Sequence, residues 1–490
     1  MRAWGVPGWR CSGTSGRAVS SEAREATRGS AIKLGAELLG RVLALVTALL
    51  IARGLGPAEF GVFAFLSGIA ILASELGDMG LQGTAQRALV ARTLSLGAML
   101  RAKVLLLVLV AAAGLAGWAL WPRPLVASAR PLLVAPLVLY YLLAGWSEFL
   151  GVALRARGRR GSEAATILCF RAATLLLVVL VFSRGLGLFG LAWALAASPV
   201  VAILVGFALL QRSSEAQPGA PEARGSLEVL RIAFPLGVNG ALVLLSLRVE
   251  ILALPWFVDD GATGLFAAAL KVVDSLILVP AAIAAGAMPA LTREALRGGG
   301  PVRERTATTV ALLGVPGAVG LFALAPGVVR LLFGAEFAPA ALPLRILAPA
   351  LLAIFLNNVL LHALMALGRA PLLPRLTAVR VGVAVISAVT LIPRFGIAGA
   401  ACGFTLSELV MLPLAARACA REGFAVPMFR GVSLGLALSL PMGFVLAFVG
   451  GSALLLIVAG ALTYGLTLLA AWRLLPRLFV SPAWAGPGGA

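Results

Sequence analysis

Charged residues are scarce in this sequence, and their scarcity determines the class of protein. Only 12% of the 490 residues are charged and 61% are hydrophobic, whereas a soluble domain carries about 25% charged residues. Water therefore cannot be the solvent for most of the chain. A membrane-spanning helix needs about 20 consecutive, mainly apolar residues, and such stretches recur along nearly the whole sequence.

Residue types that build catalytic and metal sites are scarce as well. The chain has one histidine and four widely separated cysteines, and it contains no phosphate-binding P-loop. The cysteines show neither the paired spacing of a zinc site nor a disulfide framework. Without a P-loop, direct ATP hydrolysis is not expected. We therefore expect no catalytic residues, no metal site and no cofactor.

Basic residues are the exception to this scarcity of charge, because the net charge is +20. In a soluble protein such an excess would suggest a nucleic-acid partner. Here the Lys and Arg residues sit between apolar stretches, as they do in cytoplasmic loops, so no nucleic-acid partner is expected. Residues 1–30 lack the apolar core of a cleavable signal peptide, and we expect them to form a flexible cytoplasmic leader.

The apolar stretches predict an all-α polytopic membrane protein with about 14 transmembrane helices. The predicted spans are 34–53, 60–82, 104–121, 132–153, 164–183, 188–211, 232–254, 262–289, 307–329, 346–367, 376–393, 396–416, 432–450 and 453–472. Basic residues gather in alternate loops, for example at 155–160 and 293–305. Because such flanks stay on the cytoplasmic side during insertion, we expect both termini to be cytoplasmic.

An internal repeat divides the predicted spans into two lobes. The stretch Ala153–Arg159 matches Ala363–Arg369 at an offset of 210 residues, and Gly61–Ala64 matches Gly264–Ala267 at an offset of 203. Each half holds an even number of spans, so a parallel repeat with its axis along the membrane normal is expected. The predicted parts are an N-lobe at 31–211, a cytoplasmic linker at 212–231, a C-lobe at 232–416, two further helices within 432–472 and a cytoplasmic tail at 473–490.

Three basic residues inside the spans are candidate contacts for an anionic cargo. They are Arg41, Arg248 and Lys271. An ionisable side chain in hydrocarbon is costly, so it marks a functional site or a buried pair. Guanidinium groups form forked bonds to phosphate oxygens, and lysine supplies a point charge. Arg248 and Lys271 flank the expected cleft between the lobes, whereas Arg41 could instead simply be neutralised by Glu37, one turn earlier.

Six acidic residues inside the spans are either coupling-ion sites or members of structural pairs. They are Glu37, Glu75, Asp78, Glu250, Asp274 and Glu408. Glu75 and Asp78 lie one turn apart and could hold a proton or sodium ion, or join helices. Arg248 and Glu250 are two residues apart and cannot share a helix face. Glu408 is either a coupling-ion site or the partner of Arg380.

Glu148 and Arg171 form a predicted structural salt bridge. They lie on consecutive antiparallel spans at similar distances from the connecting loop. The repeat places Asn358 and Arg380 at the corresponding positions of the second lobe, where we expect a hydrogen bond instead. Near these residues, Tyr140 and Tyr141 fit an aromatic belt at the membrane surface.

Several motifs resemble those of the polysaccharide-biosynthesis (Wzx-type) flippases, a family within the multidrug/oligosaccharidyl-lipid/polysaccharide exporter superfamily. They are Ala52–Ala64, Glu75–Leu81, Arg248–Leu252, Gly264–Lys271, Gly334–Ala340 and Leu367–Arg369. The resemblance implies alternating access between two lobes, which would move undecaprenyl-pyrophosphate-linked oligosaccharide from the cytoplasmic to the outer leaflet of a bacterial inner membrane. The implied partners are this lipid-linked oligosaccharide, membrane lipids, a glycan polymerase and glycosyltransferases.

Three other functions compete with this interpretation. A drug/cation antiporter of the same superfamily would favour an acidic cavity, and a peptidoglycan lipid-precursor flippase would have a similar helix count. A membrane glycan polymerase or ligase is an enzyme and commonly works in a large external loop. The longest predicted outside loop, around 330–345, holds no acid/base constellation, so we expect a transporter and not an enzyme.

Overall fold

The computed structural model describes residues 16–89, 91, 93–120, 131–212 and 225–474, and the elements in these ranges are all helical. The N-lobe helices are α1 (Gly16–Asp78), α2 (Leu81–Ala88), α3 (Leu96–Leu120), α4 (Pro131–Ala156), α5 (Arg160–Ser183) and α6 (Gly187–Gln211). The C-lobe helices are α7 (Ser226–Ser246), α8 (Val249–Phe257), α9 (Asp260–Leu276), α10 (Leu278–Arg297), α11 (Val302–Phe333), α12 (Ala341–Ala366) and α13 (Leu373–Arg421). Then follow α14 (Phe429–Phe448) and α15 (Ala453–Leu474).

The predicted all-α polytopic fold is confirmed. Eleven of the described helical segments are long and apolar enough to cross a membrane. Two of them contain two predicted spans each, because α1 and α13 run through a non-helical glycine at Gly56 (φ 72°) and Gly396 (φ 55°). Glycine tolerates this left-handed backbone without a steric penalty. With these two divided and α3 added, every predicted span has a helix.

Three helical features were not predicted from the sequence. The seventh predicted span is broken at Leu247 and Arg248, between α7 and α8, and the eighth is broken at Ile277, between α9 and α10. The short helix α2 follows a turn in which Met79 has a positive φ of 43°. The apolar composition continues through both breaks, so periodicity and hydropathy carry no sign of them.

The boundaries of the predicted leader and linker need correction. Residues 16–30 are helical and run directly into the first span, because alanine, glutamate and arginine in this stretch favour helix. Residues 1–15 lie outside the described ranges. Helix α7 begins at Ser226, within the predicted linker, while residues 213–224 also fall outside the description, as do residues 475–490 of the predicted tail.

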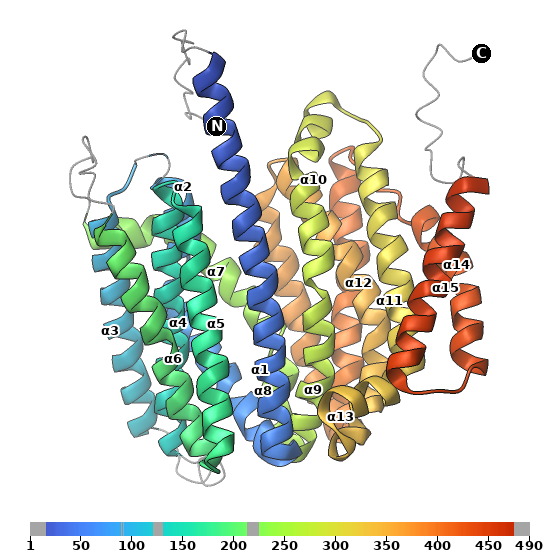
Figure 1. Cartoon of the computed structure of the whole chain (residues 1–490), viewed down its shortest axis with the longest axis horizontal. Helices are drawn as coiled ribbons and strands as arrows, with labels where there is room; N and C mark the ends of the chain where they lie inside the picture. Colours follow the sequence, from blue (N-terminus) through green and yellow to red (C-terminus); the bar gives the residue numbers. More distant parts are fainter. Residues whose placement is uncertain (1–15, 90, 92, 121–130, 213–224, 475–490) are drawn as a thin grey trace.

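Figure 1 shows how the helices are grouped. Helices α3 to α6 lie at one side, α10 to α12 lie at the other, and α14 and α15 form the far edge. This edge is joined to α11 by Tyr464, whose hydroxyl donates to the Leu312 carbonyl over 2.5 Å. The described N-terminal end of α1 and the C-terminal end of α15 lie on the same side of the molecule, as an even number of crossings requires.

The two repeats touch each other through their equivalent glycines. A Cβ added to Gly61 would lie 1.7 Å from the carbonyl oxygen of Asp260, and one added to Gly264 would lie 1.9 Å from that of Pro57. Pro57 and Asp260 are separated by the same 203 residues as the two glycines. The contact is therefore reciprocal, which is the behaviour of two copies related by a two-fold axis.

Candidate functional site

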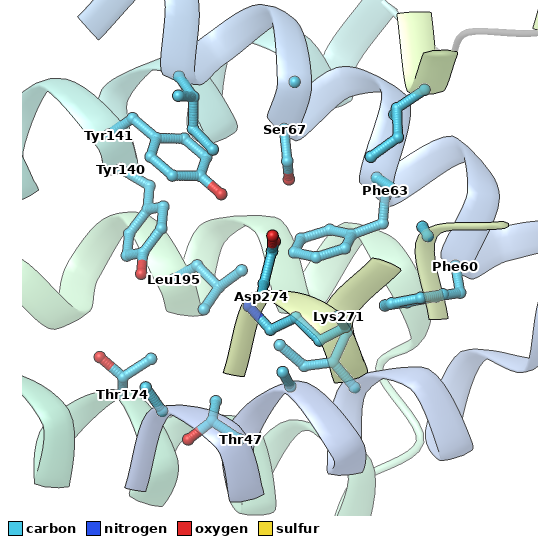
Figure 2. A pocket seen from close by; sticks show the side chains of 18 of the residues that line it. Thr47, Phe60, Phe63, Ser67, Tyr140, Tyr141, Thr174, Leu195, Lys271 and Asp274 are labelled. Carbon is cyan, nitrogen blue, oxygen red and sulfur yellow. The ribbon is translucent and has the colours of Figure 1, made fainter. Parts of the chain in front are cut away.

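A cavity of about 300 Å³ lies between the two lobes, and we call it the central cavity. Helices α1, α4, α5 and α6 line it from the N-lobe, and α8 and α9 line it from the C-lobe. The break before α8 sets one wall, because Arg248 occupies the N-cap position there. Lys271 and Asp274 reach the cavity from α9, as Figure 2 shows.

The central cavity is rich in positive charge. Three basic side chains line it, from Arg171, Arg248 and Lys271, against the single carboxylate of Asp274. Arg248 Nη1 lies 3.9 Å from Asp274 Oδ2, so this pair is at the limit of an ion pair. The structure thus brings together two of the three residues expected to contact cargo. Their role in binding stays a prediction.

Hydroxyl groups and aromatic rings complete the wall of the central cavity. Tyr140, Tyr141, Ser67, Thr47 and Thr174 all contribute to it (Figure 2). This position differs from the expected aromatic belt, because the two tyrosines lie well inside α4 and line an internal cavity. The sequence alone could not distinguish a place at the membrane surface from a place in an internal cavity, since aromatic side chains suit both.

A second cavity, of about 440 Å³, lies within the N-lobe among α1, α2, α4 and α5. We call it the N-lobe cavity. Arg41 lines this cavity and not the central one, so it does not join Arg248 and Lys271. Arg171 lines both cavities. It was not among the residues expected to contact cargo, although its place inside a span was a usable signal.

Three of the six intramembrane carboxylates lie in ion pairs of 3.3 Å or shorter. Glu37 pairs with Lys33 over 3.3 Å, and Asp78 pairs with Lys103 over 2.6 Å. Glu408 pairs with Arg380 over 2.7 Å, which is one of the two alternatives expected for it.

Glu75 and Asp274 differ from these three. Glu75 is half-buried, and its Oε1 lies 2.0 Å from where a Cβ on Gly240 would stand. A side chain at Gly240 would therefore require the Glu75 carboxylate to move. Asp274 keeps the long contact to Arg248.

The predicted salt bridge between Glu148 and Arg171 is wrong. Within the described residues Arg171 has no carboxylate in ion-pair range, and its guanidinium lies 4.9 Å from the ring of Phe170. Glu148 Oε2 instead accepts from Gln82 Nε2 over 3.4 Å. Both side chains face the N-lobe cavity, where polar surroundings remove the need for a direct pair.

In the second lobe, the asparagine that bonds to another helix is Asn357 and not the predicted Asn358. Asn358 bonds within its own helix, to the Ile354 carbonyl over 3.1 Å. The expected bond between Asn358 and Arg380 is therefore absent from the described residues, and the neighbouring Asn357 makes an inter-helix bond instead, its amide donating to Glu408 Oε2 over 3.0 Å. Arg380 joins this network and also donates to the Ser246 hydroxyl. The prediction for Asn358 is therefore wrong, and the C-lobe helices are joined by Asn357, Glu408 and Arg380.

Glu250 is the most unusual carboxylate of the described chain. It is 0% exposed, and neither of its oxygens has a hydrogen-bond partner. The break at Arg248 explains its position, because Arg248 turns to the central cavity while Glu250 is buried in the C-lobe. These two residues were expected on different faces, and the structure agrees. Around them and elsewhere in the described ranges, no group of His, Cys, Asp or Glu is arranged to hold a metal.

Two helical lobes around a polar central cavity are the architecture of a secondary transporter. The chain belongs to the polysaccharide biosynthesis protein family, whose model matches residues 26–293. No curated protein matches the sequence.

Solved structures support the fold. The Lipid II flippase MurJ in an inward closed conformation aligns with a TM-score of 0.68 and 12% identity, covering 91% of this chain and 99% of that one. An inward-facing multidrug resistance MATE family transporter of the MOP superfamily aligns with a TM-score of 0.59 and 17% identity, covering 80% and 98%. At these identities the likeness concerns the fold alone.

Proposed function

We propose that this protein is a flippase that moves undecaprenyl-pyrophosphate-linked oligosaccharide from the cytoplasmic to the outer leaflet by alternating access. The excess of basic side chains in the central cavity is the observation that carries this proposal. Arg171, Arg248 and Lys271 face Asp274 alone. In a cavity of low dielectric, such an excess attracts an anion strongly and repels a cation.

Pyrophosphate suits this cavity better than a cationic drug does. Its charge would be met by guanidinium groups, which form forked hydrogen bonds to phosphate oxygens. A drug/cation antiporter would need the opposite balance of charge. A peptidoglycan-precursor flippase would carry the same pyrophosphate. The solved protein MurJ is named a Lipid II flippase. The glycan distinguishes these two functions.

Glu250 is the strongest candidate for the group that couples transport to an ion gradient. Four of the other intramembrane carboxylates, Glu37, Asp78, Asp274 and Glu408, each lie within 4 Å of a basic partner. Glu250 has no such partner. A fully buried carboxylate without a basic partner binds a proton or a cation more readily than it stays charged and uncompensated.

The first experiment deletes the gene in its own bacterium. We expect lipid-linked glycan to accumulate on the cytoplasmic leaflet, because synthesis continues while transport stops. A membrane-impermeant glycosidase applied to intact spheroplasts and to inverted vesicles measures the two leaflets. Normal surface glycan together with increased dye sensitivity would replace the flippase proposal with drug export.

Variants of the central cavity test the residues in the same strain. Arg248→Glu and Lys271→Glu should each abolish complementation, because the reversed charge repels pyrophosphate. The matched control is Arg375→Glu, an exposed arginine of α13 outside both cavities. Membrane abundance of each variant shows whether the protein still folds. Full activity of both cavity variants would remove these residues from the cargo site.

A further inference from the structure

We propose that the N-lobe cavity holds the first sugar of the substrate while the central cavity holds its pyrophosphate. This inference rests on the proposed function and assigns a part of the substrate to each cavity. It concerns residues with no role in the proposal above, chiefly Gln82 and Gln86 on α2 and Glu148 on α4.

The charge of the N-lobe cavity favours a neutral ligand. Its wall carries three acidic and three basic side chains, from Glu37, Glu148, Glu163, Arg41, Arg155 and Arg171. Arg155 forms a forked pair with Glu163, with Nε 2.9 Å from one carboxylate oxygen and 3.0 Å from the other. An anion in this cavity would meet the carboxylates and a cation would meet the guanidinium groups. The central cavity, in contrast, has a clear excess of positive charge.

The polar groups that remain available suit a ligand with many hydroxyls. Gln86 is exposed, and the carboxamide of Gln82 makes only long bonds, of 3.3 Å to the Gly145 carbonyl and 3.4 Å to Glu148. Arg41 is exposed as well. Carboxamides both donate and accept, guanidinium donates and carboxylate accepts. A sugar hydroxyl also donates and accepts, so these groups match it in kind.

Arg171 makes the two cavities neighbours. It is a lining residue of both, and the adjacent Phe170 lines the N-lobe cavity. In a lipid-linked oligosaccharide the first sugar is bonded directly to the terminal phosphate. A site for that sugar must therefore adjoin the phosphate site, and a guanidinium shared by both cavities can bond to a phosphate oxygen and a sugar hydroxyl together.

Equilibrium binding to the purified full-length protein tests the assignment. The probes are undecaprenyl pyrophosphate without sugar and the same lipid carrying glucose, galactose or N-acetylglucosamine. We expect the wild type to bind at least one glycosylated probe about tenfold more tightly than the bare lipid, which is a typical value for one or two added polar contacts. Gln82→Ala/Gln86→Ala should lose this preference and keep its affinity for the bare lipid.

Three further variants keep the result interpretable. Gln86→Ala alone changes an exposed side chain and should fold even if the double variant does not, with a smaller loss of preference. Gln211→Ala, at the exposed end of α6 and outside both cavities, should bind like the wild type. Lys271→Ala should weaken all probes alike, because it faces the pyrophosphate.

The failure of this inference differs from the failure of the proposed function. A wild type that binds no probe would overturn the flippase proposal itself. A wild type that binds bare and glycosylated lipids equally would overturn only the sugar compartment. So would folded glutamine variants that keep the full preference, or that lose all probes to the same extent.

Discussion

Single residues in the membrane fall into two groups, those with a partner and those that face a cavity. Arg380 belongs to the first group, because it pairs with Glu408 over 2.7 Å beside Asn357. Lys271 and Arg171 belong to the second and have no such short pair among the described residues. Burial of a charge is costly unless a partner or a polar cavity compensates for it. We therefore expect structural roles for the first group and contact with cargo for the second.

The Arg380–Glu408 pair predicts a difference in thermal stability. Arg380→Ala leaves Glu408 buried without a countercharge and should cost ~3–5 kcal/mol, which lowers the melting temperature of the purified protein. Glu250→Gln removes a buried charge that has no partner and should leave the melting temperature equal or higher. Arg375→Ala is the exposed control. Equal melting temperatures for Arg380→Ala and the control would show that the network adds no stability.

The sequence predicted which basic residues lie at the cavity between the lobes, but it did not predict the partners of other charged residues. Arg248 and Lys271 were expected at the inter-lobe cleft, and they line the central cavity. Glu148 and Arg171 line the same N-lobe cavity, yet they do not pair with each other. Sequence spacing determines which residues share a helix face. The rotation of that helix against its neighbours determines which residues of the neighbouring helices they contact. The same cause explains why Asn357, and not Asn358, bonds to the facing helix.

At the scale of helices, breaks decide the position of the site. The apolar patterns predicted the helices well, because their length and hydropathy are local properties. The break between α7 and α8 gives no such local signal, although it directs Arg248 to the central cavity. Broken helices lie beside substrate sites in many transporters, since their free backbone groups face a cavity. Here the break was visible only in the three-dimensional structure.

The reciprocal glycine contact predicts the effect of a side chain between α1 and α9. Gly61→Val should separate the helices at this point, because even a Cβ would lie 1.7 Å from the Asp260 carbonyl. Thiol labelling of Ser67→Cys in the central cavity, in a background without the native cysteines, measures the opening. We expect faster labelling by a membrane-impermeant reagent. The control is Gly35→Val, where nothing lies within 4 Å; equal labelling rates would mean that this contact closes nothing.

For the whole molecule, the even number of crossings predicts both ends on one side. The described ends of α1 and α15 already lie on the same side of the structure (Figure 1). Because basic loops are retained in the cytoplasm, we expect a fluorescent protein fused to either terminus to be fluorescent and alkaline phosphatase fused there to be inactive. Phosphatase activity at one terminus alone would require an odd number of crossings.

The glycine contact between the lobes also limits how the two halves of the chain can diverge. Each glycine meets the backbone of the other repeat, so neither backbone can retreat when the opposite residue gains a side chain. A side chain at either glycine would fit within its own half, but it would clash with the backbone of the other half where the two halves are in contact. Two halves that began as copies are therefore free to differ at other equivalent positions, as Glu148 and Asn358 do, but each must keep a glycine at the point where they touch.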